Sequence, residues 1–248
     1  MKYDRKIARR RGFTLVETLL ALGLVSILIS IFLMVFVPSR TMVLDALGRQ
    51  NAESVTSVLR AEMATLKPGE VAQPGARKSS ANRFVTPFDK AFNWLQRSKK
   101  PETAVVVFSY RADTSKKRAD GVYPALQGNR NLPGLSTQLV TVACPMDDTR
   151  YAKFIPDAVG PVYIVRMTQL VYNGKGGYRL AARPGEIVGA SKPDSYVSKE
   201  GDGEPWGAAV FYRADFYLMQ PKIPARYKGR SWAQLGNPSF SANLSFRR

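Results

Sequence analysis

Gly12–Glu17 reads GFTLVE, and Leu19–Val37 close behind it reads LLALGLVSILISIFLMVFV, without a charged residue. At a rise of about 1.5 Å per residue, a helix over this apolar run is roughly 29 Å long, which matches the ~30 Å hydrocarbon core of a bilayer. Glu17 places a carboxylate at the edge of the run, where an unpaired charge costs at least about 2.5–3.5 kcal/mol. The sequence therefore predicts a membrane-spanning helix whose carboxylate needs a partner.

A basic leader precedes the apolar run. Met1–Arg11 reads MKYDRKIARRR, and Gly12, Phe13 and Glu17 follow it. This order of basic leader, Gly-Phe-Thr-Leu, hydrophobic residue, glutamate and apolar helix resembles the type IV prepilin family, which includes type IV pilins and the pseudopilins of type II secretion. The resemblance implies cleavage between Gly12 and Phe13 by a prepilin peptidase, and N-methylation of the new Phe13 amine. It also implies that Glu17 meets the Phe13 amine of a neighbouring subunit during assembly.

The resemblance predicts a structural subunit of a pilus or of a type II secretion pseudopilus, and not an enzyme. The expected partners are the prepilin peptidase, other pilin or pseudopilin subunits and the bacterial inner membrane. The chain would cross that membrane once, with its leader cytoplasmic and its C-terminal domain periplasmic, and enter a periplasmic or surface filament. In layout and size it also resembles minor pseudopilins, and a narrower relative would be the prepilin-type proteins of the Verru_Chthon cassette.

Two other interpretations of the N-terminus stay open. A secretory signal peptide also has a charged region followed by an apolar region, but its apolar region is usually only about 7–15 residues long. Glu17 is also badly placed within such a region. The other interpretation is a plain membrane anchor that is never processed and never enters a filament, and an intact Met1 in the mature protein would favour it.

The chain is strongly basic, with 37 Lys and Arg against 19 Asp and Glu and a formal net charge of +18. The leader holds six of the cations and Asp4, so the rest of the chain carries a net charge of +13. This excess indicates anionic lipid headgroups, acidic partner subunits or nucleic acid as partners, or simply a solvated basic surface. The alternative function is a tip-located or membrane-anchored basic module that contacts DNA or an acidic surface.

Residue types that carry most catalysis are scarce. The chain has no histidine, and its one cysteine, Cys144, cannot form an internal disulfide. We interpret Cys144 as a small core residue, with a reactive thiol as the alternative. Asp147 and Asp148 are adjacent and indicate a polar turn, since adjacent side chains rarely converge as a catalytic pair.

A weak calcium candidate lies in a glycine-rich loop that contains Asp202 and Glu204. Two carboxylates one residue apart suit a hard cation, but the loop is too short to supply a full oxygen cage without distant ligands. We therefore expect no metal, no cofactor and no small-molecule substrate.

The helix is expected to continue beyond the membrane. Thr41–Leu66 carries apolar residues at helical spacing that form one stripe, namely Leu44, Leu47, Val55, Val58, Leu59, Met63 and Leu66. Lys67-Pro68-Gly69 ends the pattern, because proline cannot continue a helix and glycine lets the chain turn. Pro38 removes one backbone hydrogen bond and should kink the helix.

After residue 68 the signals of β-structure dominate. Five runs are rich in β-branched and aromatic residues: Thr103–Tyr110, Thr137–Ala143, Pro161–Asn173, Tyr178–Ala182 and Gly207–Met219. The glycine-rich segment 174–177 should join two of them as a hairpin. Pro87–Arg97 is expected to form a short helix, and Phe240–Phe246 a late strand at a sheet edge.

These elements predict an α+β fold, in which a long N-terminal helix packs on a C-terminal antiparallel sheet, as in pilins. The amphipathic half of the stem should cover one face of the sheet. The expected divisions are a leader over 1–12, a stem helix over 13–66 with its membrane part at about 15–37, and a periplasmic β-rich domain with a basic tail over 67–248.

Aromatic residues and arginines alternate along the predicted strands. We expect the aromatic side chains on the core face and the arginines on the solvated face. The alternative is a sheet face that stacks and holds single-stranded nucleic acid.

Overall fold

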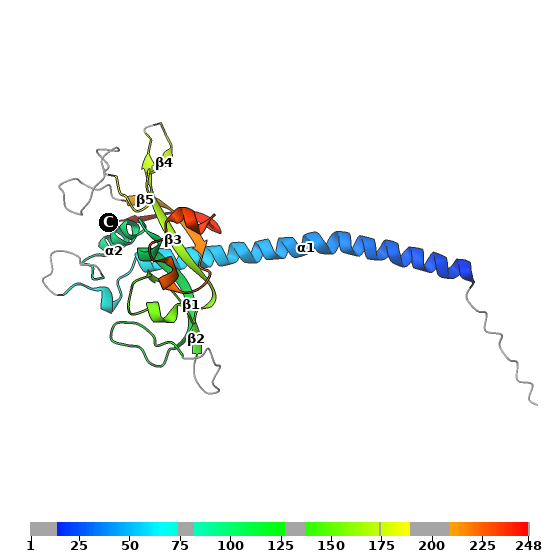
Figure 1. The fold of residues 1–248 in the computed structure, drawn as a ribbon, viewed down its shortest axis with the longest axis horizontal. Coiled ribbons are helices and arrows are strands. Elements are labelled where there is room, and N and C mark those ends of the chain that lie inside the picture. Colours follow the sequence, from blue (N-terminus) through cyan, green and yellow to red (C-terminus); the bar gives the residue numbers. More distant parts are fainter. Residues whose placement is uncertain (1–13, 74–81, 127–136, 174, 189–208, 248) are drawn as a thin grey trace, which may run out of the picture. The chain divides into compact units, whose positions relative to one another are not determined.

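The computed structural model describes residues 14–73, 82–126, 137–173, 175–188 and 209–247 (Figure 1). The chain divides into two compact units, Met1–Asn51 and Ala52–Arg248. The described residues of the first unit belong to one helix and its N-cap, and the second unit contains the sheet.

Helix α1 (Leu15–Met63) is 49 residues long and includes both the apolar run and the amphipathic stem. It continues through Pro38, which therefore does not end it. The helix ends at Met63, about one turn before the expected end at Leu66, and a 3₁₀ helix over Pro68–Glu70 follows. Proline at the start of that short helix has no N–H to donate, so it fits a first turn and not a helix interior.

The sheet is antiparallel throughout, with the order β2-β1-β3-β5-β6 and with β4 paired to β3. Its strands are β1 (Val105–Asp113), β2 (Thr137–Pro145), β3 (Val159–Tyr172), β4 (Tyr178–Leu180), β5 (Ala209–Leu218) and β6 (Phe240–Arg247). The α+β class expected from the sequence is confirmed.

Every predicted strand is present, although some ends differ. The predicted hairpin is confirmed, since Tyr172 of β3 pairs with Tyr178 of β4. The predicted late strand is β6, and it pairs with β5 at one side of the sheet. Strand β1 begins later than expected because Pro101–Thr103 forms a 3₁₀ turn ahead of it.

Helix α2 (Pro87–Arg97) has the predicted bounds. Thr86 caps it: the Asp89 backbone N–H donates to Thr86 Oγ1 (3.1 Å), and the Thr86 N–H donates to Asp89 Oδ2 (2.9 Å). This reciprocal capping box satisfies backbone donors that a helix N-terminus otherwise leaves unpaired. The Pro87 that follows the cap suits the first helical position.

One face of the sheet is covered by helices. The last turns of α1 bury Val55, Leu59 and Met63 in a core shared with the apolar face of α2 and with the sheet. The apolar face of α2 is buried there and consists of Phe88, Ala91, Phe92 and Leu95. The end of the stem thus covers this face as predicted, and α2 covers it as well.

The other face of the sheet also carries a core, which the sequence did not predict. Short 3₁₀ segments and loops cover it, with buried Tyr151, Phe154, Tyr227 and Trp232. The sequences of these segments lack the helical or strand spacing of apolar residues that would predict a layer covering the sheet. Cys144 lies in this second core, so its interpretation as a core residue is confirmed. Burial raises the pKa of its thiol, which disfavours the reactive thiolate.

Candidate functional site: the apolar N-terminal helix and the end of the stem

Thr14 forms the N-cap of α1. The Glu17 backbone N–H donates to Thr14 Oγ1 (3.3 Å) and to the Thr14 carbonyl (3.0 Å), and the Thr18 N–H donates to the same carbonyl (3.1 Å). Glu17 is therefore fixed in the first turn, where the helix dipole favours a negative charge. We did not single out Thr14 from the sequence, although Thr-x-x-Glu is the spacing of a capping box.

The predicted site residues fall in two groups. Glu17 is described, is exposed, and forms no ion pair with any residue that the structure describes. Gly12 and Phe13, and the weak calcium candidates Asp202 and Glu204, lie outside the described residues. Among the described residues, no group of three or more His, Cys, Asp or Glu side chains could hold a metal ion.

Residues Leu15–Phe32 form a segment long and apolar enough to cross a membrane, with a mean hydropathy of 2.4. None of this segment is buried within the structure, and Leu15 is 77% exposed. A helix that is apolar all round is stable only when lipid or other protein surrounds it. This segment therefore needs a membrane, partner helices, or both.

Hydroxyl groups within the apolar segment are satisfied by the helix itself. Thr18 Oγ1 donates to the Leu15 carbonyl (2.8 Å), Ser26 Oγ to the Leu22 carbonyl (2.8 Å), and Ser30 Oγ to the Ser26 carbonyl (2.9 Å). Such back-bonding removes the cost of exposing a hydroxyl to an apolar environment. The Glu17 carboxylate has no such solution among the described residues, which leaves it as the polar group that requires a partner.

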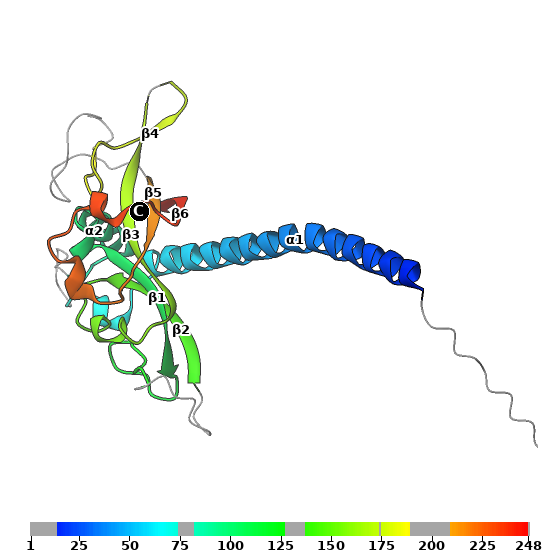
Figure 2. The same ribbon diagram turned by 45° about the vertical axis from the view of Figure 1, so that its right-hand side comes forward.

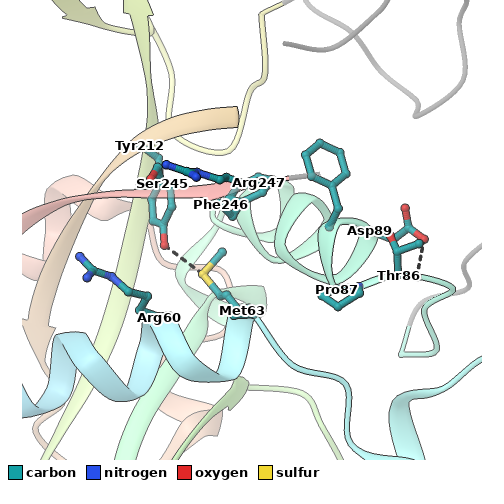
Figure 3. Close-up of a pocket in the computed structure, with 11 residues that line it drawn as sticks. Arg60, Met63, Thr86, Pro87, Asp89, Tyr212, Ser245, Phe246 and Arg247 are labelled. Atoms are coloured by element: carbon teal, nitrogen blue, oxygen red, sulfur yellow. Dashed lines mark hydrogen bonds between the residues drawn. The ribbon is translucent and has the colours of Figure 1, made fainter. Parts of the chain in front are cut away.

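The end of the stem is bound to the sheet by apolar contacts and one polar contact (Figure 3). Leu59 is fully buried, and Met63 is 2% exposed. The Tyr212 hydroxyl of β5 donates to Met63 Sδ (3.0 Å). Burial raises the pKa of Tyr212, so its hydroxyl keeps the proton that it donates.

A cluster of ion pairs lies beyond the last turn of α1. Lys90 of α2 is fully buried and donates from Nζ to Glu70 Oε2 (2.6 Å) and to the Thr65 carbonyl (3.0 Å). Lys67 Nζ donates to Glu62 Oε1 (2.6 Å), which joins the last turn of α1 to the turn that follows it. Arg150 reaches the same cluster through Glu70 Oε1 (3.2 Å).

The cluster shifts the proton affinities of its lysines in opposite directions. Burial lowers the pKa of Lys90, against the raising effect of Glu70. Burial also acts to lower the pKa of Lys67, but the Glu62 carboxylate and Tyr151 outweigh it, and the pKa is raised. Loss of one partner from such a buried pair leaves an uncompensated charge, so the cluster fixes the path of the chain as it leaves the stem.

A cavity of about 560 Å³ lies beside the end of the stem (Figure 3). Its lining includes Arg60 and Met63 of α1, Thr86 and Asp89 at the start of α2, and Arg247 of β6. Thr86 and Asp89 are both engaged in the capping box at the start of α2. This arrangement supports no catalytic assignment.

The adjacent carboxylates Asp147 and Asp148 do not act as a pair. Asp147 binds Arg97 (2.6 Å), whereas Asp148 is 2% exposed and binds Arg150 (2.6 Å). Both carboxylates thus serve structural ion pairs, as expected for a polar turn.

An apolar helix with a capped first turn precedes a domain built on an antiparallel sheet. Residues 7–33 match the family model described as the prokaryotic N-terminal methylation motif, which is the prepilin-type cleavage and methylation signature. The match includes Gly12, Phe13 and Glu17, and it confirms the resemblance seen in the sequence. Comparison with curated proteins and with solved structures gives no match.

Proposed function

We propose that this protein is a structural subunit of a pilus or of a type II secretion pseudopilus. In this account a prepilin peptidase cleaves the chain after Gly12, the new Phe13 amine is N-methylated, and the mature chain assembles with other subunits through its N-terminal helix. The observation that carries the proposal is the exposed Glu17 in the first turn of an otherwise apolar helix that matches the methylation motif.

The proposal includes a division of the chain and an orientation. The leader 1–12 is cytoplasmic, the stem 13–66 starts in the inner membrane, and the domain 67–248 is periplasmic. Cations flanking a membrane helix stay on the cytoplasmic side, and the leader Met1–Arg11 is strongly basic. The subunit is not an enzyme in this account, and the absence of histidine from the sequence supports that part.

Glu17 gives the assembly step its physical basis. After cleavage the carboxylate would lie one turn from its own Phe13 amine, and in the filament it would pair with the Phe13 amine of a neighbour. Such pairing would remove the few kcal/mol that an unpaired carboxylate costs in lipid. It would also favour one register between subunits, because a shifted register leaves two unpaired charges.

Cross-linking in cells tests this role. A photoreactive residue at Leu24, which is 60% exposed, should cross-link the full chain to partner pilins. Glu17→Ala should lower that yield by at least about tenfold, while membrane insertion and leader cleavage stay unchanged. Glu53→Ala is the matched control, because Glu53 is an exposed carboxylate farther along the same helix. Undiminished cross-linking in Glu17→Ala would mean that Glu17 is not the docking charge.

A further inference from the structure

The second face of the sheet is covered over only part of its area. Its covered part contains Ile164 and Tyr217, beneath the loops that carry Tyr227 and Trp232. Farther along the same face, the strand alternation places Leu170 and Tyr172 of β3, Tyr178 and Leu180 of β4, and Phe211 of β5. These five residues are called the aromatic face. Hairpin β3–β4 extends beyond the rest of the sheet in both ribbon views (Figures 1 and 2).

The aromatic face is exposed although its side chains contact one another. Tyr172 and Tyr178 are each 56% exposed and Phe211 is 42% exposed. The ring centroids of Tyr172 and Tyr178 are 5.9 Å apart, and those of Tyr178 and Phe211 are 5.5 Å apart. The expectation that aromatic residues lie on the core face is therefore wrong at these three positions. A contiguous exposed apolar patch of this kind marks an interaction site.

The border of the aromatic face is cationic. Asp215 is the one carboxylate at the neighbouring positions of β5 and β6 on this face, and it is 2% exposed. It binds Arg166 (2.8 Å) and Arg213 (2.7 Å), so its charge is already compensated. At the end of β6, the exposed Arg247 pairs with Ala209, so strand alternation places it beside Phe211 at the edge of this face, where it also borders the cavity beside the stem.

Carboxylates elsewhere in the described part of the domain are mostly compensated too. Ion pairs are formed by Glu62, Glu70, Glu102, Asp113, Asp120, Asp147, Asp148, Glu186 and Asp215. Without its leader the chain has a net charge of +13, and in the described part of the domain most of the negative charge is already paired. Two copies that docked through this face would bring cations together, which opposes association.

We propose that the aromatic face docks a different pilin-like subunit, whose matching surface is apolar at its centre and acidic at its rim. The inference rests on the proposed function and names its partner surface. Tyrosine, phenylalanine and arginine are the residue types enriched in the centres of protein interfaces. Charge complementarity selects an acidic partner over a second copy of this chain.

The composition of the face favours a protein over single-stranded nucleic acid. Leu170 and Leu180 are paired across β3 and β4 and offer aliphatic surface, which does not stack with bases. Tyr172 and Tyr178 meet edge to face at 70°, so the edge of one ring covers part of the other. Aliphatic side chains and the apolar edges of aromatic rings suit a protein surface.

The test places the photoreactive residue p-benzoylphenylalanine at position 211 of the full chain in its own bacterium. Irradiation should cross-link it to a second protein that has a prepilin-type leader and a net negative domain, identified by mass spectrometry. Tyr178→Ser and Arg247→Glu should each lower this yield by about fivefold or more. Leu139→Ser is the matched control, because Leu139 is an exposed apolar residue on strand β2, outside the aromatic face. Both replaced residues are exposed, and an unchanged melting temperature verifies that each variant folds.

Four outcomes would overturn the inference: no cross-link, a cross-link to a second copy of the chain, a cross-link to nucleic acid, or an unchanged yield in Tyr178→Ser. The stem probe at Leu24 is run in the same cells. Stem cross-links without face cross-links would contradict the docking surface alone, whereas loss of both would contradict the proposed function as well.

Discussion

Leu59 is one of the residues that pack the end of α1 into the core of the domain. Its side chain is fully buried between α1, α2 and the sheet. Leu59→Ala removes buried surface and leaves a cavity, so it should lower the free energy of unfolding by about 2–5 kcal/mol. Thermal melting of the full chain in detergent measures this loss. Leu139→Ala, at an exposed position, should change stability by less than about 0.5 kcal/mol, and equal effects of the two substitutions would contradict the packing described.

Asp215 makes the stability of the domain sensitive to acid. Burial acts to raise its pKa, but hydrogen bonds from Ser241, Arg166 and Arg213 outweigh burial, and the pKa is lowered. A carboxyl whose pKa is lower in the folded state contributes stability above its ordinary pKa of about 3.9, and this contribution is lost as the pH falls through the folded value.

Asp215→Asn should therefore melt at a lower temperature than the wild type near neutral pH. The difference should shrink below about pH 4, where the wild type loses the same contribution. Melting curves across this range measure the effect, with Asp157→Asn as a control at an exposed carboxylate. A difference that stays constant with pH would show that the ionised form of Asp215 is not what stabilises the fold.

At the scale of elements, the end of α1 is part of the domain. Residues Ala52–Met63 fall in the same compact unit as the sheet, and each fully buried side chain among them stabilises by about 1.5–3 kcal/mol. A chain that begins at Asp45 should thus melt at a clearly higher temperature than one that begins at Pro68. The shorter chain also loses Glu62, Thr65 and Lys67 from the ion-pair cluster. Equal melting temperatures would show that the stem does not stabilise the domain.

The elements that could be predicted are those whose apolar residues repeat at helical or strand spacing. Apolar residues at helical spacing predicted α2 with its observed bounds, and the run Phe240–Phe246 alternates as an edge strand does. The second core could not be predicted, because Tyr151 lies in a turn and Phe154 and Trp232 lie in short 3₁₀ segments, none of which has a repeating pattern. The ion pair of Lys90 with Glu70 was also missed, since 20 residues separate partners that only the fold brings together.

Of the candidate functional residues, Glu17 could be predicted from the sequence and the exposed aromatic face could not. Glu17 is evident from sequence because a charge beside an apolar run is costly wherever the run lies. The aromatic face was missed because Phe211 lies on the same side of β5 as the buried Tyr217, and only the extent of the covering loops distinguishes the two. Exposure of a strand residue depends on what packs over it, which strand sequence alone does not specify.

At the scale of the whole molecule, the chain combines an apolar helix that no described residue covers with a basic domain. The apolar helix supports a position in a membrane or a filament core, and the domain charge supports docking to acidic partner subunits. In the proposed function, pairing of the Phe13 amine in the filament requires the leader to be removed, because the six cations of Met1–Gly12 would otherwise stay attached at the helix N-terminus. Processing after Gly12 is therefore the central claim of the proposed function.

The mass of the mature N-terminus tests that claim most directly. The protein is purified from its own bacterium and its N-terminal peptide is analysed by mass spectrometry. The expected peptide starts at Phe13 and is heavier by one methyl group on the amine, while Gly12→Val retains the leader because the peptidase must accommodate a side chain at that position. A wild-type chain that retains Met1, or one that is cleaved beyond Val37, would contradict the account.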